Sequence, residues 1–306
     1  MKIMVFDVGG TEIKYSVMDE QMHRTNSGAV PTPQDTQAQF LDAVYRLYAP
    51  HKDEVSGIAM ALPGFVDNRT GYVSNGGALL YNTATPVGQL LAEKCGCPVI
   101  LENDGKAAAM AELANGALKD CCNAAVFIIG TGVGGGIIAN GQLVRGVHFT
   151  AGEYSFVNTN AEAWDAPDQN MACQCSTSNL LKWYRARKAL PEDAPLNGRS
   201  FFAAANAGEP EALEVLRRFC HAVAVQIYNL TVLLDVEKVA IGGGISKQPL
   251  LLESLRSAYD GLYASRAGQA YMEGLPRCQI VPCAFSSEAN QVGVAAAYFE
   301  AIQKKC

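Results

Sequence analysis

The feature that most constrains this chain is an apolar strand that runs directly into a helix. Residues 99–101 read Val-Ile-Leu, residues 102–104 read Glu-Asn-Asp, and an alanine-rich helical stretch continues to about residue 116. A strand that ends in a carboxylate at the start of a helix places this group at the carboxyl edge of a sheet, where α/β folds hold their ligands. Asp104 is therefore either a general base or only the N-cap of the helix, and this stretch alone favours neither reading.

The composition limits what kind of protein this is. The 306 residues are enough for two domains, 49% of them are hydrophobic and 18% are charged, and the formal net charge is −6. This charge, and the lack of an apolar run of roughly 20 residues, predict neither a nucleic-acid nor a membrane partner. The N-terminus reaches Asp7 too soon for a signal peptide, and the ten cysteines are spread along the chain. We therefore expect reduced thiols and a cytoplasmic location.

Three predicted strands are each followed by a glycine-rich turn. The strands and their turns are 3–6 with 7–11, 124–129 with 130–136, and 239–241 with 242–244. Glycine lacks a side chain and accepts positive φ, so backbone N–H groups in such turns can approach phosphates closely. Asp7, at the end of the first strand, carries the oxygen ligands that Mg²⁺ prefers, although an ordinary hairpin turn is the alternative there. The order of these turns around the strand at 99–101 predicts an ATP cleft between two similar α/β halves.

Other polar turns are candidates for contact with a neutral sugar. Pro63-Gly64 follows a predicted strand at 57–62, and the loop at 75–82 is rich in small and amide residues. Turn chemistry explains both segments equally well. Glu153 follows Ala-Gly at a predicted turn, where it is able to accept hydrogen bonds from ligand hydroxyl groups; a solvated surface glutamate is the alternative.

Five motifs together resemble the ROK family (repressors, open reading frames and sugar kinases). In chain order they are DVGGT, LENDGKAA, IGTGVGGGI, AGE and IGGGIS, and they span nearly the whole chain. The resemblance implies an α/β protein with two RNase-H-like domains of the actin/hexokinase-like ATPase fold and a central cleft. It also implies ATP and Mg²⁺ as cofactors and a homodimer. We place the N-terminal domain at 1–115 plus 288–306 and the C-terminal domain at 116–287.

The resemblance also implies roles for single residues. Asp104 matches the catalytic base, Asn103 its sugar-binding partner, and Glu153 a ligand of the sugar hydroxyls. The turns described above add Gly64, Asn75 and Gly77 as predicted sugar contacts. The predicted nucleotide contacts are Asp7, Gly9, Gly10, Thr11 and Lys14 at the first phosphate turn, Thr131, Gly132 and Gly134 at the second, and Gly243 and Gly244 at the adenosine turn. Asp7 is also the predicted Mg²⁺ ligand, directly or through water.

The chain departs from the family pattern after Glu153. Many members have a histidine where this chain has Phe156, and here Cys173 and Cys175 are not followed by the usual third cysteine and glutamate. Two of four zinc ligands are missing, so no structural zinc is expected. This zinc-less pattern, with Asn-Gly-Gly-Ala at 75–78, is similar to bacterial β-glucoside kinases of the family. The sugar stays open among glucose, mannose, N-acetylmannosamine and β-glucosides.

The predicted reaction is transfer of the ATP γ-phosphate to a hydroxyl, the 6-OH, of a hexose or hexosyl unit, with Asp104 as general base. A sugar-responsive repressor is a second hypothesis, but the first strand begins at residue 3 and leaves no room for a DNA-binding domain before it. A third hypothesis is an ATP-binding scaffold of the actin-like fold. It would have no use for the Asn103-Asp104 pair or for Glu153.

Overall fold

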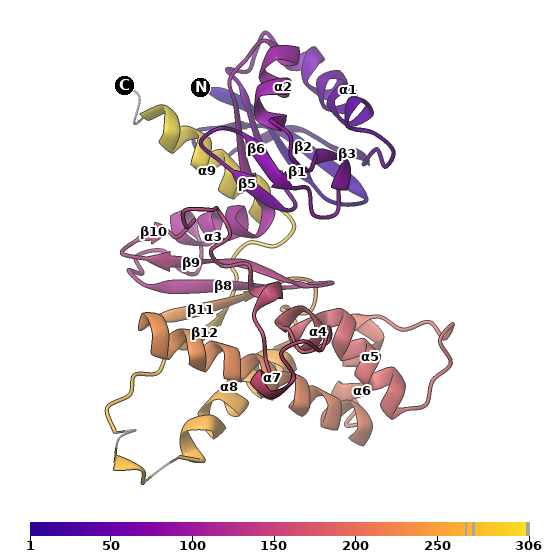
Figure 1. Ribbon diagram of the computed structural model, residues 1–306, viewed down its shortest axis with the longest axis vertical. Helices are drawn as coiled ribbons and strands as arrows, with labels where there is room; N and C mark the ends of the chain where they lie inside the picture. Colours follow the sequence, from indigo (N-terminus) through magenta and orange to yellow (C-terminus); the bar gives the residue numbers. More distant parts are fainter. Residues whose placement is uncertain (267, 271–272, 304–306) are drawn as a thin grey trace. The chain divides into compact units, whose positions relative to one another are not determined.

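The computed structural model describes residues 1–266, 268–270 and 273–303 (Figure 1). The chain forms two compact units. Unit 1 contains Met1–Gly116, Leu143–Ala151 and the C-terminal segment from Ser287, and unit 2 contains Ala117–Gln142 and Gly152–Ser286. Within the described residues, each helix is too short or too polar to serve as a membrane span.

Unit 1 is built on a five-stranded sheet with helices on both faces. The strands, in spatial order, are β3 (Arg24–Pro31), β2 (Glu12–Asp19), β1 (Lys2–Val8), β4 (Ile58–Leu62) and β7 (Val99–Asn103). Strands β1, β4 and β7 are parallel, whereas β2 is antiparallel to both of its neighbours. The parallel strands are almost completely buried, which explains their continuous apolar sequence.

Four helices cover this sheet: α1 (Gln37–Tyr48), α2 (Val87–Cys95), α3 (Asp104–Asn115) and α9 (Ala289–Gln303). Helices α1 and α2 contribute Phe40 and Leu91 to a core that also contains Phe6 of β1. Helix α9 packs against β1, β4 and β7 and lies along α3 (Figure 1). A short separate sheet, β5 (Phe65–Asp67) with β6 (Tyr72–Asn75), follows β4.

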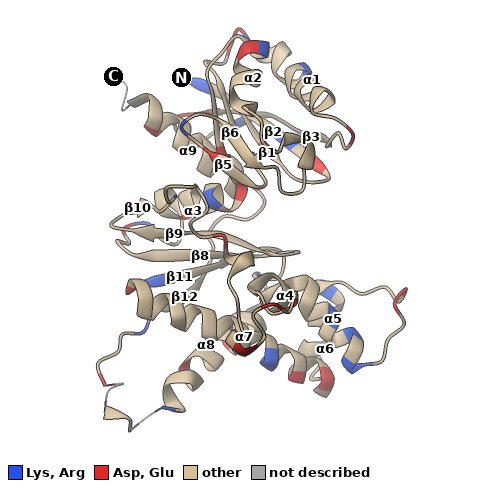
Figure 2. Ribbon diagram, viewed as in Figure 1, with Lys and Arg blue, Asp and Glu red and all other residues tan. Residues whose placement is uncertain are grey.

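Unit 2 has a sheet of the same kind. Its strands, in spatial order, are β10 (Gln142–Leu143), β9 (Val133–Ala139), β8 (Ala124–Ile129), β11 (Lys238–Gly242) and β12 (Gln279–Pro282). Strands β8, β11 and β12 are parallel, and β9 is antiparallel to β8. The α-helices in the described part of this unit are α4 (Met171–Cys175), α5 (Thr177–Arg187), α6 (Gly198–Asn206), α7 (Pro210–Leu234) and α8 (Pro249–Ala264). Figure 2 shows several basic residues along α5, where Lys182, Arg185 and Arg187 lie.

Both units therefore repeat one topology. When the strands are numbered within each five-stranded sheet alone, both sheets have the order 3-2-1-4-5, with the first two strands forming an antiparallel hairpin. This repeat agrees with the predicted pair of similar α/β halves. The second glycine cluster differs from the prediction, because Gly134, Gly135 and Gly136 belong to β9 and pair with β8 instead of extending the turn. Gly135 has φ +140°, and a Cβ there would lie 1.8 Å from the carbonyl oxygen of Val126.

Candidate active site

In unit 1, the carboxyl ends of three parallel strands bring predicted site residues to one edge of the sheet. Asp7 lies near the end of β1, the Pro63-Gly64 turn follows β4, and Asn103 ends β7. Asn103 is the N-cap of α3, because its side-chain oxygen accepts a hydrogen bond from the Lys106 N–H at 3.0 Å. Asp104 is the first residue of the helix. The reading of Asp104 as the N-cap is therefore wrong, and its carboxylate has other partners.

The carboxylate of Asp104 is oriented by its neighbours. Its Oδ1 accepts hydrogen bonds from the Gly105 N–H at 2.8 Å and from Asn103 Nδ2 at 3.1 Å. Asn103 Nδ2 also donates to the Gly64 carbonyl at 2.9 Å, which joins the end of β7 to the turn after β4. The first turn of a helix favours negative charge, so the structure holds Asp104 as a positioned carboxylate.

The predicted sugar contacts of unit 1 pack against one another. Gly64 has φ +93°, and a Cβ there would lie 2.0 Å from the Asn75 carbonyl oxygen and 2.7 Å from the Gly77 nitrogen. Gly77 has φ +57°, and its N–H donates to Asn75 Oδ1 at 2.8 Å. A Cβ on Gly10 would lie 3.1 Å from the Ala78 Cβ, so the first phosphate turn adjoins this loop. Only glycine fits at Gly64, where positive φ and close backbone approach coincide.

The first phosphate turn is held by the strand that follows it. The Gly9 N–H donates to the Glu12 carbonyl at 2.9 Å and so closes the hairpin. The carbonyl groups of the turn accept hydrogen bonds from the segment after β3: Gly9 from the Thr32 hydroxyl, Gly10 from Gln34 Nε2 and Thr11 from the Thr32 N–H. Because the Gly9 N–H is engaged within the turn, a role for it in phosphate binding would need this bond to open.

Asp7 is a buried carboxylate with few compensating contacts. It is 8% exposed, Asn290 Nδ2 donates to its Oδ1 at 2.9 Å, and Lys14 Nζ lies 3.9 Å from its Oδ2. Burial raises the pKa of Asp7, while the Asn290 hydrogen bond and the Lys14 charge oppose this shift. A bound cation would offset the cost of burying this charge. Mg²⁺ keeps several waters and needs only one or two carboxylates, so Asp7 fits it, although no group of three or more His, Cys, Asp or Glu side chains occurs among the described residues.

Replacing Asp7 by Asn is expected to stabilise the protein at neutral pH. The pKa of Asp7 is higher in the folded protein than in the unfolded chain. The free energy of unfolding therefore decreases as the pH rises from the unfolded-state pKa through the folded-state pKa, and this loss is fully present at pH 7. Asn keeps the acceptor for Asn290 without the charge. We expect the Tm of Asp7→Asn at pH 7 to exceed that of the native protein, because the buried charge is removed and the hydrogen bond is kept. Thermal unfolding from pH 4 to 8 measures it, and the gain should vanish toward pH 4.

Asp42→Asn is the matched control for this experiment. The Lys94 ammonium, whose Nζ lies 2.6 Å from Asp42 Oδ1, lowers the pKa of this exposed carboxyl. A lowered folded pKa adds stability that is present above the unfolded pKa and lost as pH falls through the folded one. Asp42→Asn should therefore lower the Tm slightly at neutral pH. A lower Tm for both variants would contradict our account of Asp7.

In unit 2, two glycine turns lie together at the carboxyl ends of β8 and β11. Gly243 has φ +96°, and a Cβ there would lie 2.1 Å from the carbonyl oxygen of Ile129, the last residue of β8. The Ser246 hydroxyl donates to the Gly243 carbonyl at 2.9 Å and fixes this turn. The structure therefore places the predicted adenosine turn of Gly243 and Gly244 against the strand that leads into the second phosphate turn.

The second phosphate turn is short and well anchored. Gly130 donates its N–H to the Gly132 carbonyl at 3.0 Å, so the tip consists of residues 130–132, with Thr131 exposed between them. The Thr177 N–H donates to the Gly130 carbonyl at 2.9 Å. Ser155 Oγ accepts from the Val133 N–H at 3.1 Å and donates to the Val133 carbonyl at 3.0 Å. Gly134 lies just inside β9.

Glu153 lies at the start of a unit 2 segment, directly before Tyr154, which is buried in the core of that unit. Tyr154 donates its hydroxyl to the Gly136 carbonyl at 3.0 Å and packs its ring against Phe127, with 4.5 Å between ring centroids. Glu153 is half-buried and precedes the 3₁₀ turn Tyr154–Phe156. Phe156 itself is 71% exposed. The loop that carries Glu153 is thus fixed on β9 by the next residue.

The two cysteines that remain of the family's zinc motif, Cys173 and Cys175, lie on α4. Cys175 is buried in the core of unit 2, and burial raises the pKa of its thiol to about 12. Metals bind the thiolate, which is scarce at neutral pH when the pKa is this high. Cys173 is half-buried, and its Sγ lies 3.7 Å from the Pro167 carbonyl oxygen.

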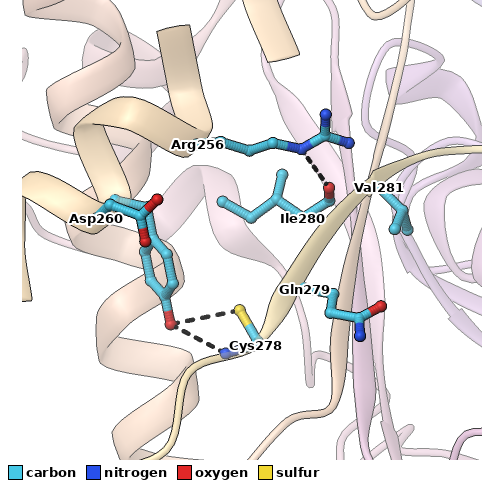
Figure 3. A pocket seen from close by; sticks show the side chains of 7 residues that line it. Arg256, Asp260, Cys278, Gln279, Ile280 and Val281 are labelled. Atoms are coloured by element: carbon cyan, nitrogen blue, oxygen red, sulfur yellow. Dashed lines mark hydrogen bonds between the residues drawn. The ribbon is translucent and has the colours of Figure 1, made fainter. Parts of the chain in front are cut away.

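A separate hollow of about 360 Å³ lies at the open edge of the unit 2 sheet (Figure 3). It is lined by residues of α8 and of the segment that forms β12, namely Arg256, Tyr259, Asp260, Cys278, Gln279, Ile280 and Val281. Arg256 Nε donates to the Ile280 carbonyl at 2.9 Å and so covers part of the exposed edge of β12 (Figure 3). None of the predicted site residues lines this hollow, and we assign it no role in the reaction.

The sequence did not identify two contacts that support the candidate site. Asn290 of α9 reaches Asp7 across 283 positions of the chain, and Arg145 forms an ion pair with Glu102 across 43 positions. Contacts between residues so far apart leave no periodic pattern in the sequence. The one local signal concerns Arg145, which lies six residues before the AGE motif at 151–153.

Comparison with known proteins identifies the family. A β-glucoside kinase of Listeria innocua is 31% identical over 258 residues, which cover 84% of this chain and 87% of the relative. The structure of a ROK family protein from Streptococcus pneumoniae in complex with sucrose aligns with a TM-score of 0.87 and 27% identity, covering 99% of this chain and 100% of the other. A ROK family glucokinase from Streptomyces griseus, in complex with glucose and AMPPNP, aligns with a TM-score of 0.79 and 25% identity, covering 97% and 99%. The ROK family profile matches residues 3–301, and this chain therefore belongs to the ROK family.

Proposed function

We propose that this chain is an ATP-dependent sugar kinase that phosphorylates a hydroxyl, the 6-OH, of a hexose or hexosyl unit. The observation that carries the proposal is the Asp104 carboxylate, held in the first turn of α3 by hydrogen bonds from Gly105 and Asn103. Relatives of similar length are named as sugar kinases, and one is bound to the ATP analogue AMPPNP. The proposal includes the two-domain division at residues 115 and 288, a homodimer and a cytoplasmic location.

Each predicted residue has a chemical task in this reaction. Asn103 and Glu153, together with the turns at Gly64, Asn75 and Gly77, would bind and orient the sugar. Asp104 would accept the proton of the attacking hydroxyl. The turns at 7–11 and 130–134, with Lys14, would hold the phosphates, and Gly243 and Gly244 the adenosine. Bound Mg²⁺, with Asp7 as its ligand directly or through water, would neutralise charge on the phosphate oxygens. Such transfer depends mostly on positioning, which agrees with the many fixed turns.

A glucoside carrying a second group is the favoured acceptor, because exposed aromatic side chains follow Glu153. Phe156 and Trp164 are 71% and 75% exposed, and an apolar ring face of this kind suits stacking on a sugar ring. Their loop is tied at its base, where the Thr159 N–H donates to the Gln169 carbonyl at 2.8 Å and the Met171 N–H to the Val157 carbonyl at 2.9 Å. We propose that this loop contacts the part of a β-glucoside that is not phosphorylated.

An ATP-dependent assay over a sugar panel tests the function. The panel contains glucose, mannose, N-acetylmannosamine, cellobiose and an aryl β-glucoside; ADP release gives kcat and KM, and phosphorus NMR gives the phosphorylated position. We expect phosphorylation at a 6-OH and the highest kcat/KM for a β-glucoside. Absence of turnover with every sugar, alongside measurable sugar binding, would instead support a regulator without catalysis.

The variant Phe156→Ala tests the proposed contact with the second group of a β-glucoside separately from the proposed sugar kinase activity. Loss of one ring contact worth about 0.5–1.5 kcal/mol predicts a KM for the β-glucoside roughly 2–13-fold higher, with the KM for glucose unchanged. Leu233→Ala is the control, because Leu233 is a comparably exposed apolar residue on α7. An equal rise in both KM values would reject the loop as a contact for the second group.

A further inference from the structure

An ion pair between the buried Glu102 and the partly exposed Arg145 lies next to the Asn103-Asp104 pair in the chain. Glu102 is 0% exposed and is the penultimate residue of β7. Arg145 Nε donates to Glu102 Oε2 at 2.8 Å, and Arg145 Nη2 lies 3.4 Å from Met110 Sδ. Arg145 comes from Leu143–Ala151, the segment that unit 1 receives between two stretches of unit 2.

Glu102 uses both of its oxygens. While Oε2 accepts from Arg145, Oε1 accepts from the backbone N–H of Asn103 at 3.1 Å. A buried carboxylate is costly, and an apolar residue of similar volume often stabilises a core better than an ion pair does. β7 is an edge strand that pairs with β4 and packs against α2 and α9, so stability alone would favour an apolar residue at the buried position of Glu102. The ion pair therefore calls for a reason other than stability.

The backbone of Arg145 makes a second connection. The Arg145 carbonyl accepts from the Ala151 N–H at 3.2 Å, which closes the segment two residues before Glu153. Phe149 of this segment is buried beneath Arg69, with the Arg69 guanidinium carbon 4.6 Å from the centre of its ring. Arg145 thus bonds through its side chain to the residue before Asn103 and through its carbonyl to the end of the segment that leads into Gly152-Glu153.

We infer that Arg145 is a positioning residue for the sugar acceptor. Through Glu102 it holds the backbone of Asn103 and so the orientation of the Asn103-Asp104 pair; through Ala151 it holds the chain that leads to Glu153. This inference rests on the proposed kinase function. Because both connections lead to predicted sugar contacts, loss of Arg145 should impair the handling of the sugar and spare the binding of ATP.

The test compares Arg145→Gln, Arg145→Lys and Glu102→Gln with the native protein on whichever panel sugar it phosphorylates best. We expect kcat/KM for the sugar to fall about 10–100-fold in Arg145→Gln, in line with the cost of a small misplacement of reacting groups, while the KM for ATP changes less than about 2-fold. The kcat/KM of Glu102→Gln should fall by a similar factor, because glutamine has one side-chain oxygen and cannot accept hydrogen bonds from both the Asn103 N–H and Arg145 as glutamate does. The double variant should be no worse than either single variant, since the residues act as a unit. Arg145→Lys keeps the positive charge but lacks the planar guanidinium group, so we expect its kcat/KM to lie between those of Arg145→Gln and the native protein.

Arg187→Gln is the matched control. Arg187 forms an ion pair of similar length with Glu214, 2.9 Å from Nε to Oε2, but both side chains are about half exposed. This variant should keep native kcat and KM. AMPPNP titration and the Tm of every variant report the folded fraction independently of the sugar reaction.

Three outcomes decide the matter. A selective loss in kcat/KM for the sugar, shared by Arg145→Gln and Glu102→Gln in folded protein, supports the inference. Native kcat and KM in Arg145→Gln, with only a lower Tm, would show a purely structural ion pair and overturn it. A native protein that phosphorylates no sugar would overturn the proposed function as well, and that result is visible before any variant is made.

Discussion

Replacement of Asp104 by Asn is expected to reduce turnover by about 10²–10⁴-fold, the usual contribution of a positioned general base. Asn at this position can still accept the hydrogen bond from the Gly105 N–H, so the start of α3 should remain intact. It cannot take up the proton of the attacking hydroxyl. The loss should therefore appear in kcat, while the affinities for AMPPNP and for the sugar stay within a few-fold of native.

Steady-state kinetics and equilibrium binding measure this prediction together. Asp53→Asn is a suitable control, because Asp53 is an exposed aspartate of unit 1 that lies outside the candidate site. We expect native kinetics for the control. Full turnover in Asp104→Asn would reject Asp104 as the base and leave the capping residue Asn103 with a structural role only.

Replacement of Gly293 by Ala is expected to destabilise unit 1 by about 3 kcal/mol or more, at the upper end of what overpacking costs. An added Cβ would lie 1.7 Å from the carbonyl oxygen of Ala107 and 2.5 Å from its carbonyl carbon. Both are backbone atoms of α3, so no side chain can rotate away. Helices α3 and α9 would have to separate, and α3 is buried along most of its length.

Gly261→Ala provides the opposite expectation for the same substitution. Gly261 lies inside α8 and is exposed, and an added Cβ there would have open space for 4 Å around it. Ala in an exposed helix interior is favoured over Gly by about 0.5–1 kcal/mol, so this variant should be slightly more stable than the native protein. Urea unfolding of both variants, followed by circular dichroism, distinguishes them. Similar stability of the two variants would contradict the close helix contact.

Local features of the site could be predicted from the sequence. The strand–helix junction at 99–115 and the hairpin at 2–19 follow from short apolar runs next to polar or glycine-rich turns. The sequence does not predict β3, because it is an edge strand whose residues are mostly exposed and therefore lack apolar alternation. It places the glycines at 134–136 in a turn, since glycine is unfavourable in strands. Close approach to Val126 explains why glycine is nonetheless required at Gly135.

The contacts that orient the predicted residues could not be predicted from the sequence. Asp104 is a candidate both for capping and for catalysis, and only the position of the Asn103 side chain assigns the cap to its neighbour. Similarly, Glu102 is one more polar residue at a strand end until the fold brings Arg145 beside it. Such partners are chosen by the tertiary fold, and no local preference of the chain encodes them.

Unit 1 is formed by three separate stretches of the sequence, and this arrangement affects the order in which the two units can fold during synthesis. The helix α9, which packs against α3, β1, β4 and β7 of unit 1, begins at Ala289, whereas unit 2 ends at Ser286. Domains generally fold as units and the N-terminal one first, but here the ribosome releases the last strand of unit 2 before the helix that completes unit 1. Until α9 has been synthesised, the surface of the unit 1 sheet and of α3 that α9 covers stays exposed. A chain truncated before α9 should keep this surface exposed and be bound by chaperones or degraded by proteases.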